Sequence, residues 1–394
     1  MRYEYFVSLR YLLAKRKEKF ISIISTISIL GVAVGVCALI VVIGVMTGFD
    51  NDLRDKIVGT NSHLVIEKEG GIEDPNSVIG RINVFPHVIA ASPFLNGQVL
   101  IVYGNQTNSI ILRGITPSEE IKVTRIGEYI KKGSIKNLKG EEILIGSEFA
   151  NKFNLDVGDA VPIISPFDGK IRNFKVVGIF NSGMYDYDLN LAFVELRKAQ
   201  ELYGMETKVG GVGVKIDDVY LAEGLKMRMQ RELGFPYCVR SWMDLNRSLF
   251  AALKLEKLAM FVILSLIIIV ACLNIISTLI MVVMEKTKDI GILKAIGATN
   301  RSIMAIFTLE GFLIGTIGTI LGVASGLGLS YLLEKYQFIQ LPRDIYYIDR
   351  FPVDVQFGDT VVIVIAALMI SLLSCIYPAW QASRLNPVDA LRYE

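Results

Sequence analysis

The amino-acid sequence predicts a membrane protein with four transmembrane α-helices and a large α+β extracytoplasmic domain between the first and second helices. The composition is 52% hydrophobic and 20% charged, with a mean hydropathy of +0.47. That balance is too apolar for an ordinary water-soluble domain and too charged for a chain that lies wholly within a bilayer. Four stretches are long and apolar enough to cross about 30 Å of hydrocarbon. A long region of mixed polarity separates the first two.

The four apolar stretches divide the chain into segments on alternating sides of a membrane. The predicted segments are a cytoplasmic amphipathic helix at 1–19, transmembrane helices at 20–46, 258–284, 302–333 and 360–380, the extracytoplasmic domain with its stalk at 47–257, a cytoplasmic helix at 285–301, an extracytoplasmic loop at 334–359 and a cytoplasmic tail at 381–394. The first stretch is too long for the apolar region of a secretory signal, so we expect an uncleaved anchor.

Positive charge sets the predicted orientation. Basic residues cluster before the first apolar stretch: Arg2, Arg10, Lys15, Arg16, Lys17 and Lys19. Because cytoplasmic segments carry an excess of Lys and Arg, both ends of the chain are expected in the cytoplasm. The loop 334–359 agrees with an external position, since its five acidic residues outnumber its three basic ones.

The external region alternates between strand and helix patterns, which predicts an α+β domain. Strands are expected at His63–Glu67, Val99–Tyr103, Ser109–Ile115, Ile143–Ile145, Ala160–Ile164, Phe174–Phe180, Leu191–Glu195 and Val212–Ile216. Helices are expected at Ser147–Phe153, Glu195–Tyr203 and Asp218–Leu233. The turn residues Pro166-Phe-Asp-Gly169 predict a hairpin. After Trp242 the pattern is helical and predicts a continuous stalk into the second apolar stretch.

Small and polar residues within the apolar stretches predict close contacts between helices. Glycines four residues apart, as at Gly31 and Gly35, allow helices to approach closely in lipid, and the spacing is repeated through 311–328. Asn274 is expected to face another helix, as are Ser277 and Thr278. Glu310 is expected to be structural, because no second buried charge is predicted beside it.

A short charged segment lies between the second and third apolar stretches. Its sequence is Glu285-Lys-Thr-Lys-Asp-Ile-Gly-Ile-Leu-Lys-Ala-Ile-Gly-Ala298. Ile290, Leu293 and Ile296 recur at helical spacing and could dock on a partner. The charged residues expected to face water are Lys286, Lys288, Asp289 and Lys294. On this pattern alone, an ordinary amphipathic connector is the alternative.

The sequence contains no recognisable motif for chemistry of its own. It lacks a G-x-x-x-x-G-K-[ST] loop for nucleotide phosphates and an H-E-x-x-H motif, and His63 and His87 lack the spacing of metal ligands. We therefore expect a non-catalytic chain that binds no cofactor or metal itself. The net charge of +2 argues against nucleic-acid binding. Cys238 is the only cysteine expected in the external region, so no intrachain disulfide is expected there.

Two segments resemble the FtsX/MacB-type permease subunits of ABC transporters. They are Glu285–Ala298 and the terminal Tyr377-Pro-Ala-Trp-Gln-Ala-Ser-Arg-Leu-Asn-Pro-Val-Asp-Ala-Leu-Arg392. Within that group, three further runs look like the lipoprotein-releasing (LolC/LolE) permeases: Tyr5-Phe-Val-Ser-Leu-Arg-Tyr-Leu12, Phe20-Ile-Ser-Ile-Ile-Ser-Thr-Ile-Ser-Ile-Leu-Gly-Val-Ala-Val-Gly-Val36 and Val45-Met-Thr-Gly-Phe49.

The resemblance implies a multi-pass protein of the bacterial inner membrane, with cytoplasmic termini and a MacB-like periplasmic domain, that works by mechanotransmission. The implied partners are an ABC ATPase dimer that binds ATP and Mg, a second permease subunit of the same or a related kind, a lipoprotein substrate and a periplasmic lipoprotein carrier. The coupling helix of the family corresponds to the charged segment, which would dock on the ATPase.

The resemblance also implies three sets of site residues. The ATPase-coupling residues would be Glu285, Lys286, Asp289, Ile290, Gly291, Leu293, Lys294, Ala295 and Gly297. Lipid chains of the substrate would lie at the outer ends of the first two transmembrane helices, with ordinary lipid-facing surface as the alternative for these positions: Val42, Met46, Phe49, Leu258, Met260, Phe261 and Val262. The carrier-docking hairpin would present Pro166, Phe167, Lys170 and Arg172, with a simple turn as the alternative.

Two other functions fit the same family. A MacB-like efflux permease would drive a periplasmic channel, although the commonest form carries a fused ATPase domain that this chain lacks. An FtsX-like regulator would transmit ATP hydrolysis to cell-wall hydrolases, although the external domain predicted here is much larger than in such regulators.

Overall fold

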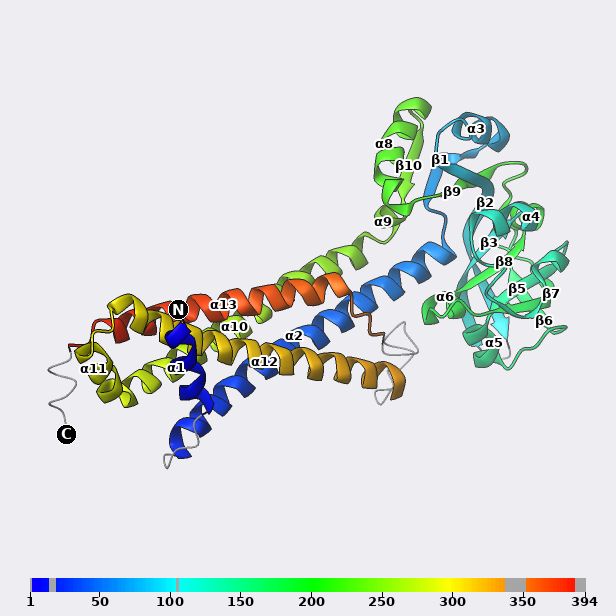
Figure 1. Cartoon of the computed structure of the whole chain (residues 1–394). Coiled ribbons are helices and arrows are strands. Elements are labelled where there is room, and N and C mark those ends of the chain that lie inside the picture. Colours follow the sequence, from blue (N-terminus) through cyan, green and yellow to red (C-terminus); the bar gives the residue numbers. More distant parts are fainter. Residues whose placement is uncertain (1, 14–18, 104–105, 337–351, 387–394) are drawn as a thin grey trace. The chain divides into compact units, whose positions relative to one another are not determined.

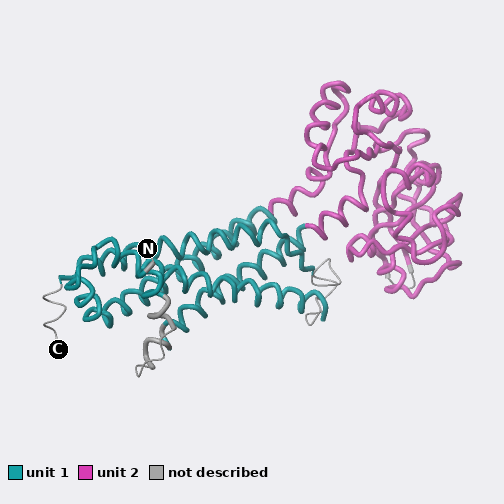
Figure 2. Tube along the Cα trace, in the orientation of Figure 1, with its two compact units in different colours: residues 1–50, 253–339, 351–394 teal, residues 51–252, 340–350 magenta. Residues whose placement is uncertain are grey.

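The computed structural model describes residues 2–13, 19–103, 106–336 and 352–386 (Figure 1). These residues form two compact units, which Figure 2 shows in different colours. The helical unit contains the described residues up to Asp50 and from Leu253 onward, and the sheet unit contains those from Asn51 to Ala252. Each unit is described by itself below.

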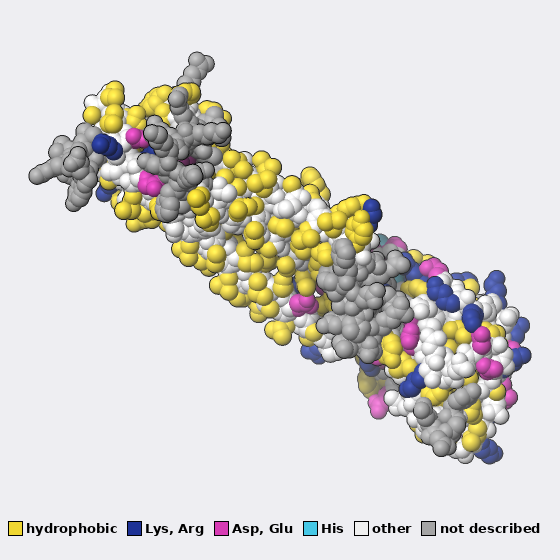
Figure 3. Space-filling model, turned by 90° about the horizontal axis from the view of Figure 1, so that it is seen from below, with side chains coloured by type: hydrophobic (Ala, Val, Ile, Leu, Met, Phe, Trp, Pro, Cys, Tyr) yellow, Lys and Arg dark blue, Asp and Glu magenta, His cyan; other side chains and the backbone are white. Residues whose placement is uncertain are grey.

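Six helices contribute to the helical unit. They are α1 (Arg2–Leu13), α2 (Lys19–Thr60), α10 (Arg247–Glu285), α11 (Thr287–Ala295), α12 (Asn300–Tyr336) and α13 (Phe357–Ser383). In the described part of the chain, four of these are long and apolar enough to cross a membrane: α2, α10, α12 and α13. Hydrophobic side chains cover most of the face of this unit that Figure 3 shows, as expected for helices surrounded by lipid.

The helices α2 and α10 extend beyond the predicted transmembrane segments. α2 continues past the predicted end of the first transmembrane segment at Met46 as far as Thr60. No proline interrupts this extension, and Lys56 pairs with Asp52 one turn earlier at 2.9 Å. The predicted helical stalk before the second transmembrane segment is observed, because α10 begins at Arg247.

Glycines on α12 bring α2, α12 and α13 into close contact, which confirms the prediction from their spacing. A Cβ added to Gly311 would lie 2.1 Å from Sγ of Cys375 on α13. A Cβ added to Gly318 would lie 2.7 Å from Cβ of Val32 on α2. Further contacts under 3.2 Å occur at Gly315, Gly322 and Gly326.

Polar residues join α2 to α10 within the apolar region. The hydroxyl groups of Ser28 and Thr278 share a hydrogen bond. One turn away, a Cβ added to Gly31 would lie 2.3 Å from Nδ2 of Asn274, so only glycine admits the amide at this distance. The prediction that Asn274 and Thr278 face another helix is confirmed, and α2 is the helix that they face. The same prediction was wrong for Ser277, which is exposed.

The sheet unit contains a ten-stranded sheet and several short helices. The strands are β1 (Leu64–Ile72), β2 (Val88–Tyr103), β3 (Gln106–Ile115), β4 (Ile130–Gly133), β5 (Glu142–Gly146), β6 (Ala160–Ile164), β7 (Ile171–Phe180), β8 (Leu191–Glu195), β9 (Val209–Ile216) and β10 (Tyr237–Ser241). The α-helices are α3 (Pro75–Ile82), α4 (Pro117–Val123), α5 (Ser147–Phe153), α6 (Tyr185–Asn190), α7 (Leu196–Tyr203), α8 (Ala222–Leu233) and α9 (Trp242–Leu245).

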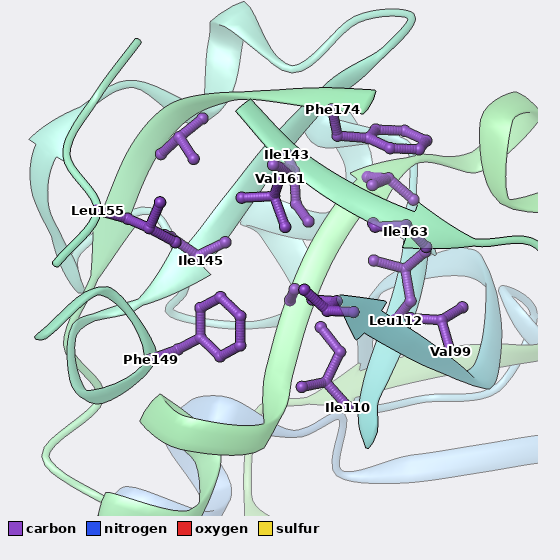
Figure 4. Packing of buried hydrophobic residues seen from close by; sticks show 14 of the residues in the cluster. Val99, Ile110, Leu112, Ile143, Ile145, Phe149, Leu155, Val161, Ile163 and Phe174 are labelled. Carbon is purple, nitrogen blue, oxygen red and sulfur yellow. The ribbon is translucent and has the colours of Figure 1, made fainter. Parts of the chain in front are cut away.

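Six of the strands close into a ring. The pairings run β2, β3, β8, β5, β7 and β6, and β6 pairs again with β2 through Leu100 and Ile164. Buried side chains from these strands point toward one another inside the ring, as Figure 4 shows for Ile143, Val161 and Phe174. The ring therefore encloses one of the hydrophobic cores of this unit.

Strands β10, β1 and β9 form an antiparallel sheet with β2, in the order β10, β1, β9 and β2, while β4 pairs with β7 of the ring. β2 belongs to both parts, because Val88–Phe94 pairs with β9 and Phe94–Tyr103 pairs with β3. The edge at β10 is closed by Gln230 of α8, whose side-chain amide donates to the Tyr237 carbonyl oxygen at 2.8 Å and accepts from the Val239 N–H at 2.8 Å. The side chain thus occupies backbone groups that a further strand would need.

Most predicted strands and helices of this unit are observed. β6, β8 and α5 have the predicted ends, whereas β4, β10, α3, α4, α6 and the first half of β2 were not predicted. Pro93 obscured the first half of β2, because proline has no N–H to donate to a ladder. The structure admits Pro93 opposite Val212 of β9, immediately before the pairing with β3 begins.

Candidate functional site

The charged segment between α10 and α12 forms the short helix α11. Lys286 precedes the helix, and the hydroxyl of Thr287 donates to the Val283 carbonyl oxygen at 3.1 Å, which supports the turn out of α10. Gly297 follows the helix with a φ of 109°, a backbone conformation that only glycine adopts easily. The predicted helix is therefore observed, with a glycine at its end.

The inward face of α11 differs from the one expected. Ile290 is 1% exposed and packs, with Leu293 beside it, in a cluster contributed by α10, α12 and α13. The buried members of this cluster are Val282, Val283, Ile290, Ile303, Ile306, Phe307, Ala379 and Ala382. The expectation that Ile290 faces a partner was wrong, because the chain itself covers it, whereas Leu293 is half-buried. Gly291 is also buried.

The outward face of α11 carries two large apolar side chains. Ile296 is 80% exposed, as predicted, and Ile292 is 45% exposed, although the sequence analysis did not single it out. They lie four residues apart and therefore on one side of the helix. Exposed neighbours along the segment are Glu285, Lys288, Ala295 and Gly297.

Lys294 was expected to face water but bonds within the chain. Its ammonium group donates to the carbonyl oxygen of Ser383 at 2.6 Å and to that of Leu385 at 2.8 Å. Ser383 is the last residue of α13 and Leu385 lies two residues beyond it, where the last turn of a helix leaves carbonyl oxygens without partners in the helix. Lys294 supplies partners for them from another helix.

Lys286 was also expected to face water and is buried, with 7% of its surface exposed. Its ammonium group lies 3.6 Å from Asp289 and within electrostatic range of Glu310 on α12. Glu310 is itself only 2% exposed. The expectation that no second buried charge accompanies Glu310 was therefore wrong, because Lys286, which precedes α11 in the chain, is buried within electrostatic range of it.

The predicted lipid-facing residues lie on two neighbouring helices. Those on α10 are largely exposed, with Leu258 at 59%, Phe261 at 68% and Val262 at 50%, while Met260 is half-buried. Those on α2 are half-buried: Val42, Met46 and Phe49. An ion pair of 2.7 Å between Asp50 of α2 and Lys257 of α10 joins the helices at this level. The two sets therefore lie close to each other.

A segment before α13 packs on α2 beside these residues, which the sequence analysis missed. The N–H of Asp354 donates to the Gly44 carbonyl oxygen at 2.9 Å. A Cβ added to Gly48 would lie 2.7 Å from the Pro352 carbonyl oxygen. The two glycines thus provide a flat side of α2 on which this backbone lies. The spacing of Gly44 and Gly48 was a signal for a close contact, but not for its partner.

The hairpin between β6 and β7 is observed, with the Ser165 N–H donating to the Lys170 carbonyl oxygen at 2.9 Å. Phe167 is 69% exposed, and Pro166 and Lys170 are exposed as well. Arg172 pairs with Asp168 at 3.3 Å and with Glu201 at 3.7 Å. The expected basic rim is therefore reduced, because the charge of Arg172 is balanced within the chain.

The two histidines, His63 and His87, each make a hydrogen bond or an ion pair within the sheet unit. His63 accepts a hydrogen bond from the Ile216 N–H at Nδ1, at 3.2 Å, and His87 pairs with Asp217 at 2.9 Å. Among the described residues, no group of three or more His, Cys, Asp or Glu side chains is placed to hold a metal ion.

Two family models and several named relatives match this chain. Residues 261–387 match the family of FtsX-like permease C-terminal domains, and residues 25–232 match the MacB-like periplasmic core domain. The lipoprotein-releasing system transmembrane protein LolC of Xylella fastidiosa is 37% identical, over 98% of each chain. The corresponding LolE of Haemophilus influenzae is 28% identical, also over 98% of each chain. Among solved structures, the periplasmic region of MacB from Actinobacillus actinomycetemcomitans aligns with a TM-score of 0.35 at 15% identity, over 50% of this chain and 95% of that one.

Four candidate membrane-crossing helices, a sheet-containing insertion after the first and a short helix between the second and third define a membrane permease subunit of the FtsX/MacB type. Within that class, the similarity to one group runs through nearly the whole chain. The chain belongs to the LolC/LolE family of lipoprotein-releasing system transmembrane proteins.

Proposed function

We propose that this chain is the permease subunit of an ABC transporter that extracts lipoproteins from the bacterial inner membrane and hands them to a periplasmic carrier. A separate ATPase dimer would bind ATP and Mg²⁺, and this chain would convert closure of the ATPases into movement of its helices and sheet unit. The names of the relatives support the substrate class. The family match over 261–387 supports the role of a permease.

In this proposal α11 and both ends of the chain lie in the cytoplasm, and the sheet unit lies in the periplasm. The basic residues before α2 and around α11 support that orientation, because positive charge is retained on the cytoplasmic side. The match of residues 25–232 to a MacB-like periplasmic core domain supports the position of the sheet unit.

The observation that carries the proposal is the exposed apolar pair on α11. Ile292 and Ile296 project from a helix of nine residues whose opposite side is buried among three other helices. Within the described residues neither side chain belongs to a hydrophobic cluster. A short helix that presents apolar residues one turn apart is suited to a groove in a partner protein, here the ATPase.

The substrate path would run beside α2 and α10. Leu258 and Phe261 leave large apolar surfaces exposed, and Met46 nearby is a flexible side chain that adapts to acyl chains of different shape. A second permease subunit, the same chain or a related one, would cover this side and enclose the lipid between the two copies. The periplasmic carrier would then dock at the hairpin that presents Phe167.

The test is co-expression with the cognate ATPase, followed by purification and reconstitution with a tagged triacylated lipoprotein. Ile296→Asp should reduce ATPase recovery by roughly ten- to a hundredfold, because a charge in an apolar groove is costly. Ile292→Asp should act in the same direction. Val84→Asp is the matched control, since Val84 is 81% exposed in the sheet unit.

The same preparation separates the alternatives. ATP-dependent release of lipoprotein from the membrane supports the proposal. Activation of cell-wall hydrolases without lipoprotein release would instead indicate an FtsX-like regulator, and ATP-dependent export of small molecules would indicate a MacB-like efflux permease. Full ATPase recovery with both aspartate variants would remove α11 from the interface.

A further inference from the structure

We propose that Lys294 is a positioning residue that holds α11 on the end of α13, so that force applied to α11 moves α13 together with α12. The inference rests on the proposed function, in which α11 receives force from an ATPase. It assigns to Lys294 a role inside the permease, in place of the polar contact with the ATPase expected from the sequence.

The Lys294 ammonium group binds the end of α13 through two hydrogen bonds. Its two acceptors, the carbonyl oxygens of Ser383 and Leu385, lie at 2.6 and 2.8 Å, which are short distances for bonds between nitrogen and oxygen. A positive charge at the carboxyl end of a helix also interacts favourably with the helix dipole. Lys294 therefore closes the end of α13 in the way that a residue of α13 itself would.

Apolar side chains pack α11 against α13 next to these hydrogen bonds. On the same side of α11, Ile290 lies in the cluster that includes Ala379 and Ala382, both fully buried on α13. Farther along, Gly311 of α12 lies against Cys375 of α13 with no room for a Cβ. Apolar contacts thus join α11, α12 and α13, and Lys294 adds a directional contact that fixes how α11 is oriented on α13.

The acceptors of the Lys294 ammonium group are main-chain oxygens, and this determines how force passes from α11 to α13. Lys294 bonds to main-chain oxygens, so the contact survives changes of side chain on α13 but requires an ammonium or guanidinium group at residue 294. α12 follows α11 directly in the chain, whereas α13 is reached only through space. Without Lys294, α11 could rotate on its apolar side while α13 stays behind. A loss of coupling, rather than a loss of assembly, is therefore expected.

The experiment compares Lys294→Met and Lys294→Arg in the full chain, co-purified with its ATPase and reconstituted with a tagged triacylated lipoprotein. Lys294→Met should bind ATPase and hydrolyse ATP within about twofold of wild type but release about fivefold less lipoprotein per ATP. Lys294→Arg should restore most of the release, because its guanidinium group reaches the same carbonyl oxygens. Hydrogen exchange of the Gln381–Leu385 amides should be faster in Lys294→Met, since the helix end loses a partner.

Arg384→Met is the matched control. It removes a positive charge from the same end of α13, but the Arg384 guanidinium lies over the Trp380 ring, 4.1 Å from its centroid, and not on the two carbonyl groups. It should leave release per ATP unchanged.

Three results would decide against or separate the proposals. Wild-type release per ATP in Lys294→Met would overturn the positioning role. Loss of ATPase binding in Lys294→Met would also overturn it, because Lys294 would then be a docking residue. If the wild-type complex releases no lipoprotein at all, the proposed function fails, and unchanged exchange at the end of α13 would then overturn the positioning role on its own.

Discussion

The ring of Phe167 lies against the backbone of Gly204, so closely that a Cβ on Gly204 would come within 2.3 Å of ring carbon Cδ2. Gly204 ends α7 with a φ of 65°. Beside this contact, the hydroxyl of Ser165 donates to the Leu202 carbonyl oxygen at 3.0 Å. The hairpin between β6 and β7 is thus held on the end of α7. An exposed ring that is already ordered loses little conformational freedom when a partner covers it.

Phe167→Ala should weaken binding of the periplasmic carrier to the full chain by about 1–3 kcal/mol, the usual effect of losing an aromatic anchor. Titration of the purified carrier onto the detergent-solubilised protein measures the change. Val157→Ala, at another exposed apolar residue of the sheet unit, is the control. Equal affinity of the wild type and Phe167→Ala would make the hairpin a simple turn.

Salt dependence provides a separate prediction for the same contact. Because Arg172 is paired with Asp168 and Glu201, Lys170 is the basic residue of this hairpin with its charge exposed to a partner. Added salt should therefore lower the rate of carrier association only slightly, and Lys170→Met should remove most of that dependence. Stopped-flow association at low and high salt measures it. A steep dependence that survives Lys170→Met would point to another charged surface.

Gly291→Pro should abolish ATP-dependent release while membrane insertion survives. Proline inside a helix removes a backbone donor and clashes with the preceding turn, at a cost of about 3 kcal/mol. A proline at residue 291 would disrupt the nine-residue helix α11, which contains the exposed Ile292 and Lys294, the donor of the hydrogen bond to Ser383. Release assays on reconstituted complexes give the result, with membrane fractionation as the check on insertion. Wild-type release would show that α11 need not be helical.

Gly48→Ala should destabilise the protein, although alanine normally favours a helix over glycine by about 1 kcal/mol. The added Cβ would meet the Pro352 carbonyl oxygen at 2.7 Å and displace the segment that lies on α2. Gly358→Ala, where an added Cβ meets nothing within 4 Å, should be neutral or stabilising. Melting temperatures in detergent distinguish the two. A Gly48→Ala protein as stable as Gly358→Ala would mean that the segment moves aside at no cost.

Photo-crosslinking residues at Met46 and Met260 should capture a triacylated lipoprotein during turnover. The two methionines lie on α2 and α10, which the Asp50–Lys257 ion pair joins beside them. Thioether side chains adapt to varied apolar shapes, which suits an acyl-chain site. The crosslinked products are identified by mass spectrometry. Capture of phospholipid alone would make these positions ordinary lipid-facing surface.

The pH dependence of stability should show the effect of His63. Burial lowers the pKa of His63 to about 4, so the folded sheet unit does not take up this proton until well below the ordinary range. The unfolded chain takes it up near pH 6.5, as ordinary histidines do. The free energy of unfolding should therefore fall as the pH is lowered from about 6.5 to 4, by about 3 kcal/mol from this residue alone. Denaturant titrations of wild type and His63→Gln measure the loss.

Asp188 should act in the opposite direction over part of the same range. Burial raises the pKa of the Asp188 carboxyl to about 6, so the folded protein takes up this proton before the unfolded chain does. Stability from this group therefore increases as the pH falls from about 6 toward 4. Asp188→Asn should make the acid-induced loss steeper, and His63→Gln should make it shallower. Identical pH profiles for both variants would contradict the assigned pKa directions.

Local patterns in the sequence predicted the elements well but not which side of them is covered. The strand at Ala160–Ile164 and the helix at Ser147–Phe153 depend on neighbouring residues and have the predicted ends. The periodicity of α11 likewise identified Ile290, Leu293 and Ile296, but not Ile292. The periodicity could not reveal that Ile290 is buried and Ile292 is exposed. Which side of α11 is covered depends on how α10, α12 and α13 pack around it.

Contacts between residues distant in sequence account for the other features that the sequence analysis did not predict. Lys294 lies 89 and 91 residues before its two acceptors, Ser383 and Leu385, and nothing near residue 294 signals that pairing. Gly48 likewise meets a backbone that returns from residue 352. A lysine on a helix pattern is equally consistent with water and with a buried carbonyl group, so only the assembled chain distinguishes the two.

The pairing of β1 with β10 places the beginning and the end of the sheet unit next to each other, since Leu64 lies opposite Ser241 in one antiparallel ladder. A domain with adjacent entry and exit points can be inserted into a helical protein, enlarged or exchanged without changing the distance between the helices that flank it. The junctions after Thr60 and before Arg247 are therefore natural boundaries for chimaeras between permeases.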